Sequence, residues 1–191
     1  MAPPGRTCRT TQESVAGVDD RVLVEAAQAG DLAAFEALVR RHQAAVYRTA
    51  LRLLGSSADA DDVTQDTFLR AWRALAQFRA ESAFSTWLYR IVTRRCLDML
   101  AARRSTDVID IERIDAGADP ATTAEQRERF RAVLTQIAAL PPDERAALVL
   151  REFEDLSYED VAHVLDITVP AVKGRIHRAR LSVLKETTAW R

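Results

Sequence analysis

Apolar residues recur every three or four positions along most of the chain, the spacing that gathers them on one face of an α-helix. The first such stretch covers residues 20–55. Within it, Asp31 is placed to cap a helix start and Gly55 to end a helix. The same spacing returns in two further stretches, at about 58–78 and 85–104. Together the stretches predict a first all-α domain over residues 20–104.

The two later stretches carry most of the large apolar side chains of this domain. We expect the first of them to turn inward Val63, Phe68, Leu69, Trp72 and Leu75. We expect the second to turn inward Trp87, Leu88, Ile91, Val92, Leu97 and Leu100. Amphipathic helices of this kind are stable when their apolar faces pack against one another.

Residues 105–123 interrupt the pattern. They read STDVIDIERIDAGADPATT, an acidic segment with a glycine and a proline and no amphipathic period. This composition is typical of a flexible linker. Helical spacing resumes over 124–187, broken once by a proline pair, and predicts a second small all-α domain. Residues 1–19 are mixed and polar and are expected to form a tail.

The second domain contains a pattern typical of two short helices joined by a tight turn. Ser157 followed by Asp160 resembles a capping box, with Asp in place of the usual Glu or Gln, and predicts a helix through Leu165. Thr168 is placed to cap the next helix, and Pro170 is tolerated in its first turn. We expect this second helix to turn toward the core Val172, Ile176, Leu181 and Leu184.

The charges are balanced overall but unevenly distributed. Twenty-seven Lys and Arg face 28 Asp and Glu, for a formal net charge of −1. Between residues 82 and 104, however, five arginines accompany one acid, and residues 170–185 hold five basic residues and no acid. Acid-rich segments, 105–128 and 141–166, precede the second basic helix. Two separate basic helices suggest two points of contact with one polyanion.

A helix, a short turn and a basic second helix together predict a helix-turn-helix that presents side chains to the major groove of DNA. An αα-hairpin that serves only for packing is the alternative. The absence of acids from the second helix favours DNA binding.

Several classes of function are disfavoured by what the sequence lacks. Two cysteines, Cys8 and Cys96, exclude a disulfide scaffold or a cysteine-rich zinc site, and the three histidines have no metal-ligand spacing. No catalytic set, phosphate loop or dinucleotide fingerprint is evident. No signal peptide or membrane-spanning run is present. We therefore expect a cytoplasmic protein that is not an enzyme and has no metal, cofactor or membrane insertion. Cys96 is expected to be a small buried apolar residue, with a redox pair between the two cysteines as the alternative.

Five blocks of sequence resemble one protein family. Two resemble region 2 of the extracytoplasmic-function (ECF) sigma factors of the sigma-70 family: DDVTQDTF at 61–68 and FSTWLYRI at 84–91. Three resemble region 4 and its recognition helix: LPPDER at 140–145, LSYEDVA at 156–162 and VKGRIHRAR at 172–180. The blocks follow the family's order, and the resemblance covers roughly 20–104 and 125–185.

The resemblance implies a transcription initiation subunit that binds bacterial RNA polymerase core, through its beta and beta-prime subunits, and directs promoter recognition and melting. Its partners would be the core enzyme, promoter DNA and an anti-sigma factor. The segment that docks on the polymerase clamp in the family matches Asp61, Asp62, Gln65, Asp66, Phe68, Leu69 and Trp72. A solvated acidic helix start is the alternative reading of those acids.

The family also uses the segment around residues 78–95 to open the −10 element and hold the exposed strand. Stacking surfaces and phosphate neutralisation are what single-stranded DNA binding requires. The matching residues are Phe78, Arg79, Phe84, Arg90, Arg94 and Arg95, while Trp87 and Tyr89 are expected at the core or its edge. Arg94 stands where the family usually has Asn, which adds positive charge near the −10 DNA.

In the recognition helix, the residues that match −35 contacts are Lys173, Arg175, His177 and Arg178. A bidentate base contact discriminates by about 1–3 kcal/mol, whereas a phosphate contact weakens all sequences alike. His177 is expected to pack or to contact a phosphate at the edge of the interface rather than to read a base. Gly174 replaces a frequent Ser at a cost of about 1 kcal/mol in helix propensity.

Two other kinds of protein remain open from the residues alone. A dimeric helix-turn-helix regulator would bind duplex operators without polymerase, but it has no use for the aromatic and basic segment at 78–95. A helical interaction protein without nucleic acid would tolerate loss of Lys173, Arg175 and Arg178.

Overall fold

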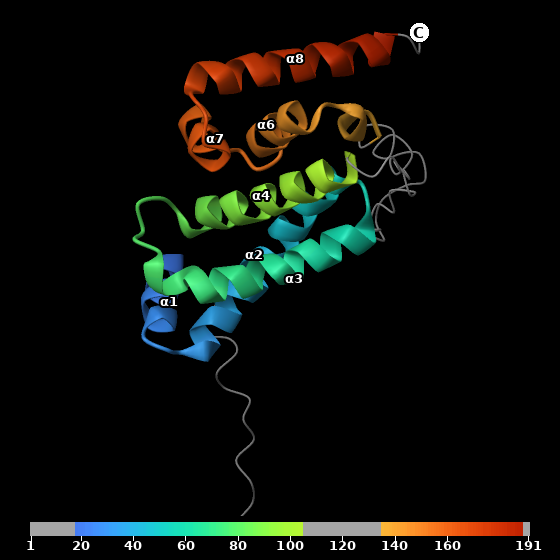
Figure 1. The fold of residues 1–191 in the computed structure, drawn as a ribbon. Helices are drawn as coiled ribbons and strands as arrows, with labels where there is room; N and C mark the ends of the chain where they lie inside the picture. The colour runs from blue at the N-terminus through green and yellow to red at the C-terminus, as the bar shows by residue number, and fades with distance from the viewer. Residues whose placement is uncertain (1–17, 105–134, 189–191) are drawn as a thin grey trace, which may run out of the picture.

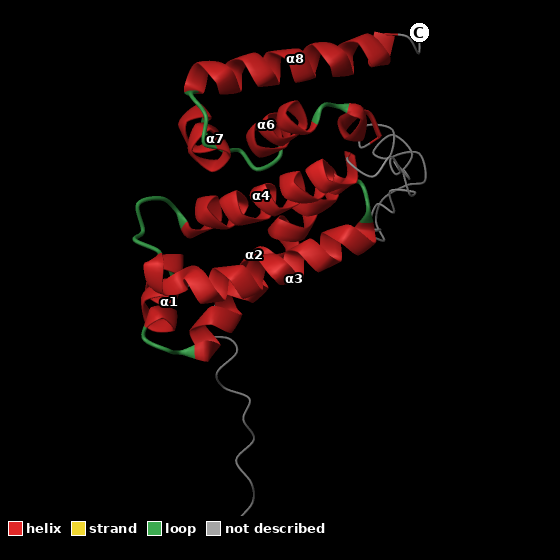
Figure 2. Ribbon diagram, in the orientation of Figure 1, coloured by secondary structure: helices red, strands yellow, loops and turns green. Residues whose placement is uncertain are grey.

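The computed structural model describes residues 18–104 and 135–188, and all regular structure within these ranges is helical (Figures 1 and 2). The first unit comprises α1 (Asp20–Gln28), α2 (Leu32–Leu54), α3 (Ser57–Ala74), the short 3₁₀ helix η1 (Leu75–Gln77) and α4 (Phe84–Arg104). The second unit, after a helical turn at 135–139, comprises α6 (Pro142–Glu152), α7 (Tyr158–Leu165) and α8 (Val169–Thr188). The all-α prediction is confirmed. The predicted linker and nearly all of the predicted tail lie outside the described residues.

The helix ends follow the local signals in the sequence. The Asp31 carboxylate accepts hydrogen bonds from two backbone amides at the start of α2, and Gly55 ends that helix with a φ of 72°. The left-handed conformation at Gly55 favours glycine because it has no Cβ. Ser157 caps α7 by accepting from the Asp160 amide, and Thr168 accepts from the Ala171 amide in the first turn of α8. The predicted caps are therefore confirmed.

The core of the first unit lies where α2 packs against α1, α3 and α4. Leu38, Leu53 and Leu88 are almost completely buried there. Buried small and β-branched residues fill the remaining space. They are Ala60, Val63 and Ala71 on α3 and Val92 and Thr93 on α4. Burial of these side chains removes apolar surface from water and is the main force that holds the helices together.

The second unit buries one row of α8, and the sequence prediction of that row is partly wrong. Val172 and Ile176 are buried, as is Ala179. Leu181 and Leu184, which were expected in the core, are 45% and 61% exposed. At about 100° per residue, Leu181 lies half a turn around the helix from Val172, so the buried row cannot include both.

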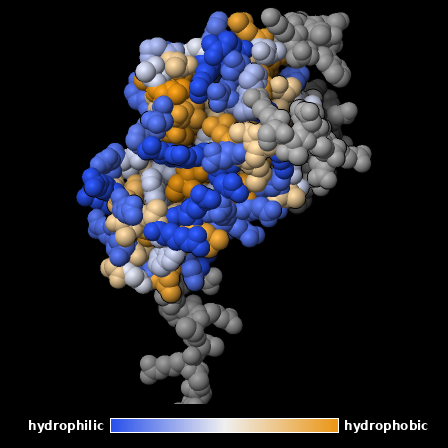
Figure 3. All heavy atoms as spheres, in the orientation of Figure 1, coloured by the Kyte–Doolittle hydropathy of each residue, from blue (hydrophilic) through white to orange (hydrophobic). Residues whose placement is uncertain are grey.

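The two units pack face to face. Figure 1 shows α8 outermost, α6 and α7 beneath it, then α4, with α2 and α3 beyond. Helix α7 contacts α4, and α6 contacts both α2 and α4. The buried guanidinium of Arg145 in α6 donates to the Leu53 carbonyl at the end of α2. On the face drawn in Figure 3, hydrophobic patches show between bands of hydrophilic residues. Within the described ranges, no helix has the length and apolar content needed to cross a membrane.

Candidate polymerase and nucleic-acid interfaces

The first half of α3 presents an exposed polar row. Asp61, Asp62 and Gln65 are all exposed. Asp66 differs, because its carboxylate accepts from Arg70 at 2.9 Å and from Arg95 of α4 at 2.8 Å. Three of the four predicted polar residues are therefore open to a partner, while the fourth joins α3 to α4.

The apolar residues next to this row divide between surface and core. Leu69 is 56% exposed and Trp72 38%, whereas Phe68 is only 8% exposed. Phe68 therefore turns inward as the helical spacing predicts and does not supply partner-facing surface, whereas Leu69 and Trp72 do not turn inward and remain open to a partner. Phe68 follows Thr67 on the buried side of α3, while Leu69 lies about 100° further around the helix. The Trp72 ring lies 4.8 Å from the Phe35 ring, centroid to centroid.

Three aromatic rings meet where the chain enters α4. Phe78 lies 4.9 Å from Trp87 and 5.9 Å from Phe84, and Phe84 lies 5.7 Å from Trp87. Phe84 is 4% exposed and also contacts the His42 ring. Its ring faces are covered, so the prediction that Phe84 meets a flipped base is contradicted. Phe78 is half-buried and Arg79 is exposed, so these two remain candidates.

A residue that sequence reasoning missed holds the loop before α4. The Gln28 side-chain amide, at the end of α1, donates to the carbonyls of Leu75 and Phe78, each at 2.9 Å. Two residues later, Ala80 has a φ of 54°, in the left-handed region that non-glycine residues rarely adopt. The amide therefore fixes the backbone immediately before this turn. No local pattern marks Gln28, because its partners lie 47 and 50 residues away.

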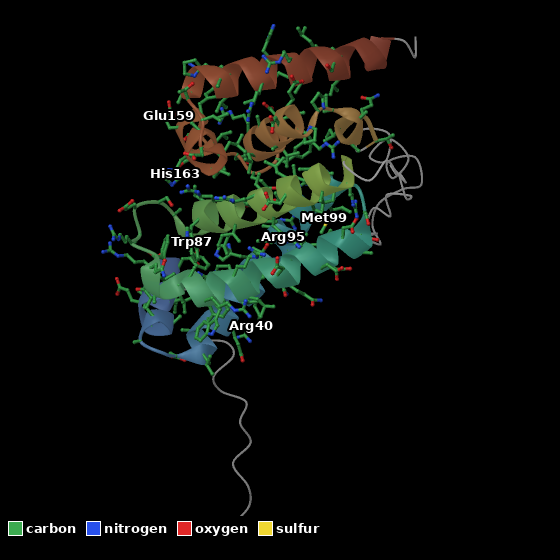
Figure 4. The ribbon with its side chains drawn as sticks, in the orientation of Figure 1. Arg40, Trp87, Arg95, Met99, Glu159 and His163 are labelled. Atoms are coloured by element: carbon green, nitrogen blue, oxygen red, sulfur yellow. The ribbon has the colours of Figure 1, made fainter. Side chains whose placement is uncertain are left out.

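The predicted arginines of α4 have unequal access to solvent. Arg94 is exposed, and Arg95 is half-buried in its ion pair with Asp66. Arg90 is half-buried beside a shallow pocket of about 200 Å³, which Arg79, Trp87 and His163 also line. Figure 4 shows His163 of α7 above the first turns of α4. The second unit therefore stands over this end of the candidate −10 surface.

Helices α7 and α8 form the predicted helix-turn-helix. Asp166 ends α7 in the left-handed conformation, with a φ of 55°. His177 and Arg178 are exposed on α8, and Lys173 lies over the Tyr158 ring at 5.4 Å. A Cβ at Gly174 would meet only ordinary contact distances, so packing within the protein does not require glycine there.

The acids of α6 pair with the arginines of α8. Arg175 lies 3.3 Å from Asp143, Arg178 2.6 Å from Glu144, and Arg180 2.5 Å from Glu152. These ion pairs are partly exposed and are therefore weak, about 0–1 kcal/mol each. Acids and cations that the sequence assigns to separate segments thus face each other across α6 and α8.

A buried polar cluster joins the two units. Glu154, in the α6–α7 connection, accepts from Thr49 at 2.8 Å, from Arg52 at 3.0 Å and from Tyr89 at 2.8 Å. Burial raises the pKa of Tyr89, and the hydrogen bond to Glu154 raises it further. Burial lowers the pKa of Arg52, although the Glu154 carboxylate opposes that shift. The sequence analysis missed this cluster, because Glu154 is only one of several acids in the acid-rich segment 141–166.

The one described cysteine, Cys96, is buried in α4 and is free. Burial raises the pKa of its thiol to about 12. It is the small buried residue that was predicted, and Cys8 lies outside the described residues. Among the residues described, no group of three or more metal-ligating side chains comes together.

Comparison with known proteins gives two family matches in chain order. The family model Sigma-70 region 2 matches residues 38–106, and the model Sigma-70, region 4 matches residues 130–183. The first match contains most of the first helical unit, and the second contains the helix-turn-helix.

Curated relatives align over most of their length. The chain is 39% identical over 176 residues to the ECF RNA polymerase sigma-E factor of Escherichia coli K12, an alignment covering 86% of this chain and 92% of that protein. It is 40% identical over 178 residues to the RNA polymerase sigma-H factor of Pseudomonas aeruginosa, covering 87% and 92%.

Solved structures share the fold. The structure of CnrH in complex with the cytosolic domain of CnrY matches with a TM-score of 0.70 and 32% identity, over 89% of this chain and 97% of that one. The sigma factor RpoE in complex with the anti-sigma factor NepR from Bartonella quintana matches with the same TM-score at 22% identity, over 82% and 98%.

Proposed function

Because the chain belongs to the ECF sigma factors of the sigma-70 family, we propose that it binds bacterial RNA polymerase core and directs the enzyme to promoters, which it also helps to melt. The observation that carries this function is the pair of family matches in order, each falling on a folded helical unit with a basic helix. Members of the family are initiation factors rather than enzymes.

Core polymerase would bind the exposed row of α3. Asp61, Asp62 and Gln65 supply polar contacts there, and Leu69 and Trp72 supply adjoining apolar surface. Exposed large apolar side chains beside charged ones are typical of a protein-binding patch. The polymerase clamp is the expected partner of this surface.

The −10 surface would lie around the loop before α4. Phe78 and Arg79 are placed to meet an exposed base and its phosphate, and Arg90 and Arg94 extend the basic surface along α4. Stacking on an aromatic ring stabilises an unpaired base by about 1–3 kcal/mol, and flipping costs a few kcal/mol. Several such contacts acting together can therefore support local melting without ATP.

The −35 surface would lie on α8, where Lys173, His177 and Arg178 are exposed and Arg175 is half-buried beside α6. Lys173, Arg175, His177 and Arg178 lie on the helix that follows the tight turn, the position from which a helix-turn-helix reads the major groove. The α6 acids Asp143 and Glu144 each pair with one of these arginines.

Membership of this family also suggests regulation by an anti-sigma factor. Two structural relatives were solved with partner proteins bound, one of them named as an anti-sigma factor. We propose that this chain acts on RNA polymerase in the bacterial cytoplasm and is held inactive there by a partner of that class.

Run-off transcription tests the proposed function. Purified bacterial core polymerase is incubated with a library of promoter fragments, with and without this chain. New transcripts that share a two-part promoter would support the proposal. Operator protection by the chain alone, with no transcripts, would instead favour a duplex-binding regulator.

A further inference from the structure

Arg178 differs from the other arginines of α8 in the nitrogen that its ion pair uses. The Nε of Arg178 donates to the Glu144 carboxylate at 2.6 Å, so this pair occupies the inner nitrogen of the guanidinium. Arg175 and Arg180 instead pair with their acids through a terminal nitrogen, Nη2. Arg178 therefore keeps Nη1 and Nη2 outside its ion pair, and within the described ranges neither atom makes another hydrogen bond.

Two free terminal nitrogens are what an arginine needs in order to recognise guanine. The commonest base-specific contact between proteins and DNA runs from two guanidinium nitrogens to O6 and N7 of one guanine in the major groove. With Nε bound to Glu144, the open edge of the Arg178 guanidinium carries Nη1 and Nη2 side by side, a pair of donors that matches O6 and N7. In Arg175 and Arg180, an acid already contacts one of those two nitrogens.

The guanidinium of Arg178 lies beside Gly174, one turn nearer the start of α8. A Cβ at Gly174 would lie 3.5 Å from Nη1 of Arg178. The arginine side chain therefore runs back along the helix, as long helical side chains generally do, and brings its guanidinium to the level of the second turn. The N-terminal turns of a recognition helix are the part that contacts base edges. Glycine at this position has no side chain to cover the guanidinium from that side.

Glu144 is placed to fix this arrangement from a neighbouring helix. It lies in the first turn of α6, where its backbone amide donates to the Pro141 carbonyl at 3.0 Å and where the helix macrodipole stabilises a carboxylate. Its side chain is only 15% exposed, whereas that of Arg178 is 59% exposed. Helix α6 packs directly beneath α8 (Figure 1). The carboxylate thus orders an exposed arginine in advance, and order that is already present does not have to be supplied on binding.

We propose that Glu144 is a positioning residue for promoter recognition: it holds Arg178 by Nε so that Nη1 and Nη2 contact one guanine of the −35 element. The proposal rests on the proposed function for its target, and within that function it identifies what sets specificity at one base pair. Glu144 keeps its contact while DNA is bound, because Nε and the two terminal nitrogens are separate donors.

Selection from a library of duplexes measures the base preference at each position of the −35 element. The full chain, with and without purified bacterial core polymerase, is incubated with promoter fragments randomised around that element, and the bound fragments are sequenced. The variants are R178A, which removes the guanidinium, E144A, which removes the acceptor, and E144Q, whose amide oxygen still accepts from Nε. The matched control is E152A, because Glu152 is an α6 acid that pairs with Arg180 through Nη2. Circular dichroism checks that every chain keeps its helices.

We expect the parent holoenzyme to prefer guanine at one position and R178A to reduce that preference by about 5- to 150-fold, the equivalent of about 1–3 kcal/mol for one bidentate contact. E144A should relax the same position by about 3- to 10-fold, the range for ordering one long side chain, and should leave the other positions unchanged. E144Q and E152A should keep the parent's preference. E144A should cause no further loss in the R178A background, since the two residues act as one unit.

The position dependence separates positioning from a merely structural role, which would lower the affinity for all sequences alike. An unchanged guanine preference in E144A, or an equal loss at every position, would overturn the proposal. It would also be overturned if R178A keeps the parent's preference. If E144A does not fold, E144L, which accepts no hydrogen bond, decides in its place.

Run-off transcription with the same chains separates this proposal from the proposed function. Transcripts from the parent together with an unchanged preference in E144A would leave the function standing and refute the positioning role. No transcripts, but relaxation of one position by E144A in duplexes that the chain binds without core polymerase, would keep the positioning role and refute the initiation function. A parent chain that selects no sequence, alone or with core polymerase, would refute both.

Discussion

The two basic helices, α4 and α8, carry similar charge but occupy opposite positions in the fold. Helix α4 packs chiefly against α2, α3, α6 and α7, whereas α8 packs chiefly against α6 and α7. Helix α4 accordingly buries Phe84, Leu88, Val92 and Cys96, while α8 buries the single row through Val172 and Ile176. The candidate DNA-binding residues on α4 thus share their helix with the protein core, and those on α8 project from the edge. Substitutions in α4 should change stability, and those on the outer face of α8 should change recognition.

The largest expected effect comes from the core side of α4. Leu88 is 1% exposed, so L88A removes buried apolar volume and should lower the free energy of unfolding by about 2–5 kcal/mol. The matched change L184A on α8, where the leucine is 61% exposed, should cost less than about 0.5 kcal/mol. Urea denaturation followed by circular dichroism measures both. Equal losses of unfolding free energy in L88A and L184A would contradict the view that α4 belongs to the core and the outer face of α8 does not.

The outer face of α8 should show the reverse behaviour. R178A removes a candidate DNA contact, and the one ion pair it breaks, with Glu144, is partly exposed. The free energy of unfolding should therefore change by at most about 1 kcal/mol. Binding of holoenzyme to a promoter should weaken by about 1–3 kcal/mol if Arg178 reads a base. A salt titration across several promoters distinguishes the two roles. A base contact relaxes specificity at one position, whereas a phosphate contact lowers affinity uniformly and reduces the salt slope by about one.

The loop that leads into α4 should respond to loss of Gln28. Q28A leaves the carbonyls of Leu75 and Phe78 without their side-chain donor, at a cost of about 1–2 kcal/mol. Promoter opening, followed by permanganate reactivity of unpaired thymines, should fall while binding to −35 duplex stays unchanged. Q28E, which cannot donate, should behave like Q28A, and Q43A, at an exposed glutamine of α2, should behave like the parent. Normal promoter opening by Q28A would show that Gln28 does not position the loop before α4 for melting.

The smallest expected effect is a pH dependence that arises from α4. The pKa of Cys96 is raised to about 12, so the folded chain retains the thiol proton where the unfolded chain loses it. Its contribution to stability is complete below the unfolded pKa near 9 and is lost as pH rises from there toward 12. The expected loss is about 1.4 kcal/mol at pH 10, one unit above the unfolded pKa, since one pKa unit corresponds to about 1.4 kcal/mol. Denaturation of the parent and of C96A at pH 8 and pH 10 isolates this contribution. If the free energy of unfolding falls equally between pH 8 and pH 10 in both chains, other titrating groups cause the loss.

Packing between segments accounts for the site residues whose predicted placement was wrong. Phe68 turns inward as its helical spacing predicts, so only its predicted contact with a partner fails, while Phe84 is buried, contrary to its predicted stacking role. Neighbours decide such positions: Phe84 is covered by His42, Phe78 and Trp87, and the first of these is 42 residues earlier in the chain. The exposed polar residues of α3 were easier to predict, because adjacent acids are seldom buried without partners.

The amino-acid sequence alone is enough to predict the helices, the caps at Asp31, Gly55 and Ser157, the helix-turn-helix and the family. Each of these depends on hydrogen bonds or spacing within a few residues, or on motifs read in order along the chain. The contact between the two units depends on the folded arrangement, as does the position of Glu154 among Thr49, Arg52 and Tyr89, which are 65 to 105 residues away. That arrangement also decides that the acids of α6 face the arginines of α8. Local sequence fixes backbone conformation, whereas the burial and pairing of a side chain depend on which distant surface the folded chain brings against it.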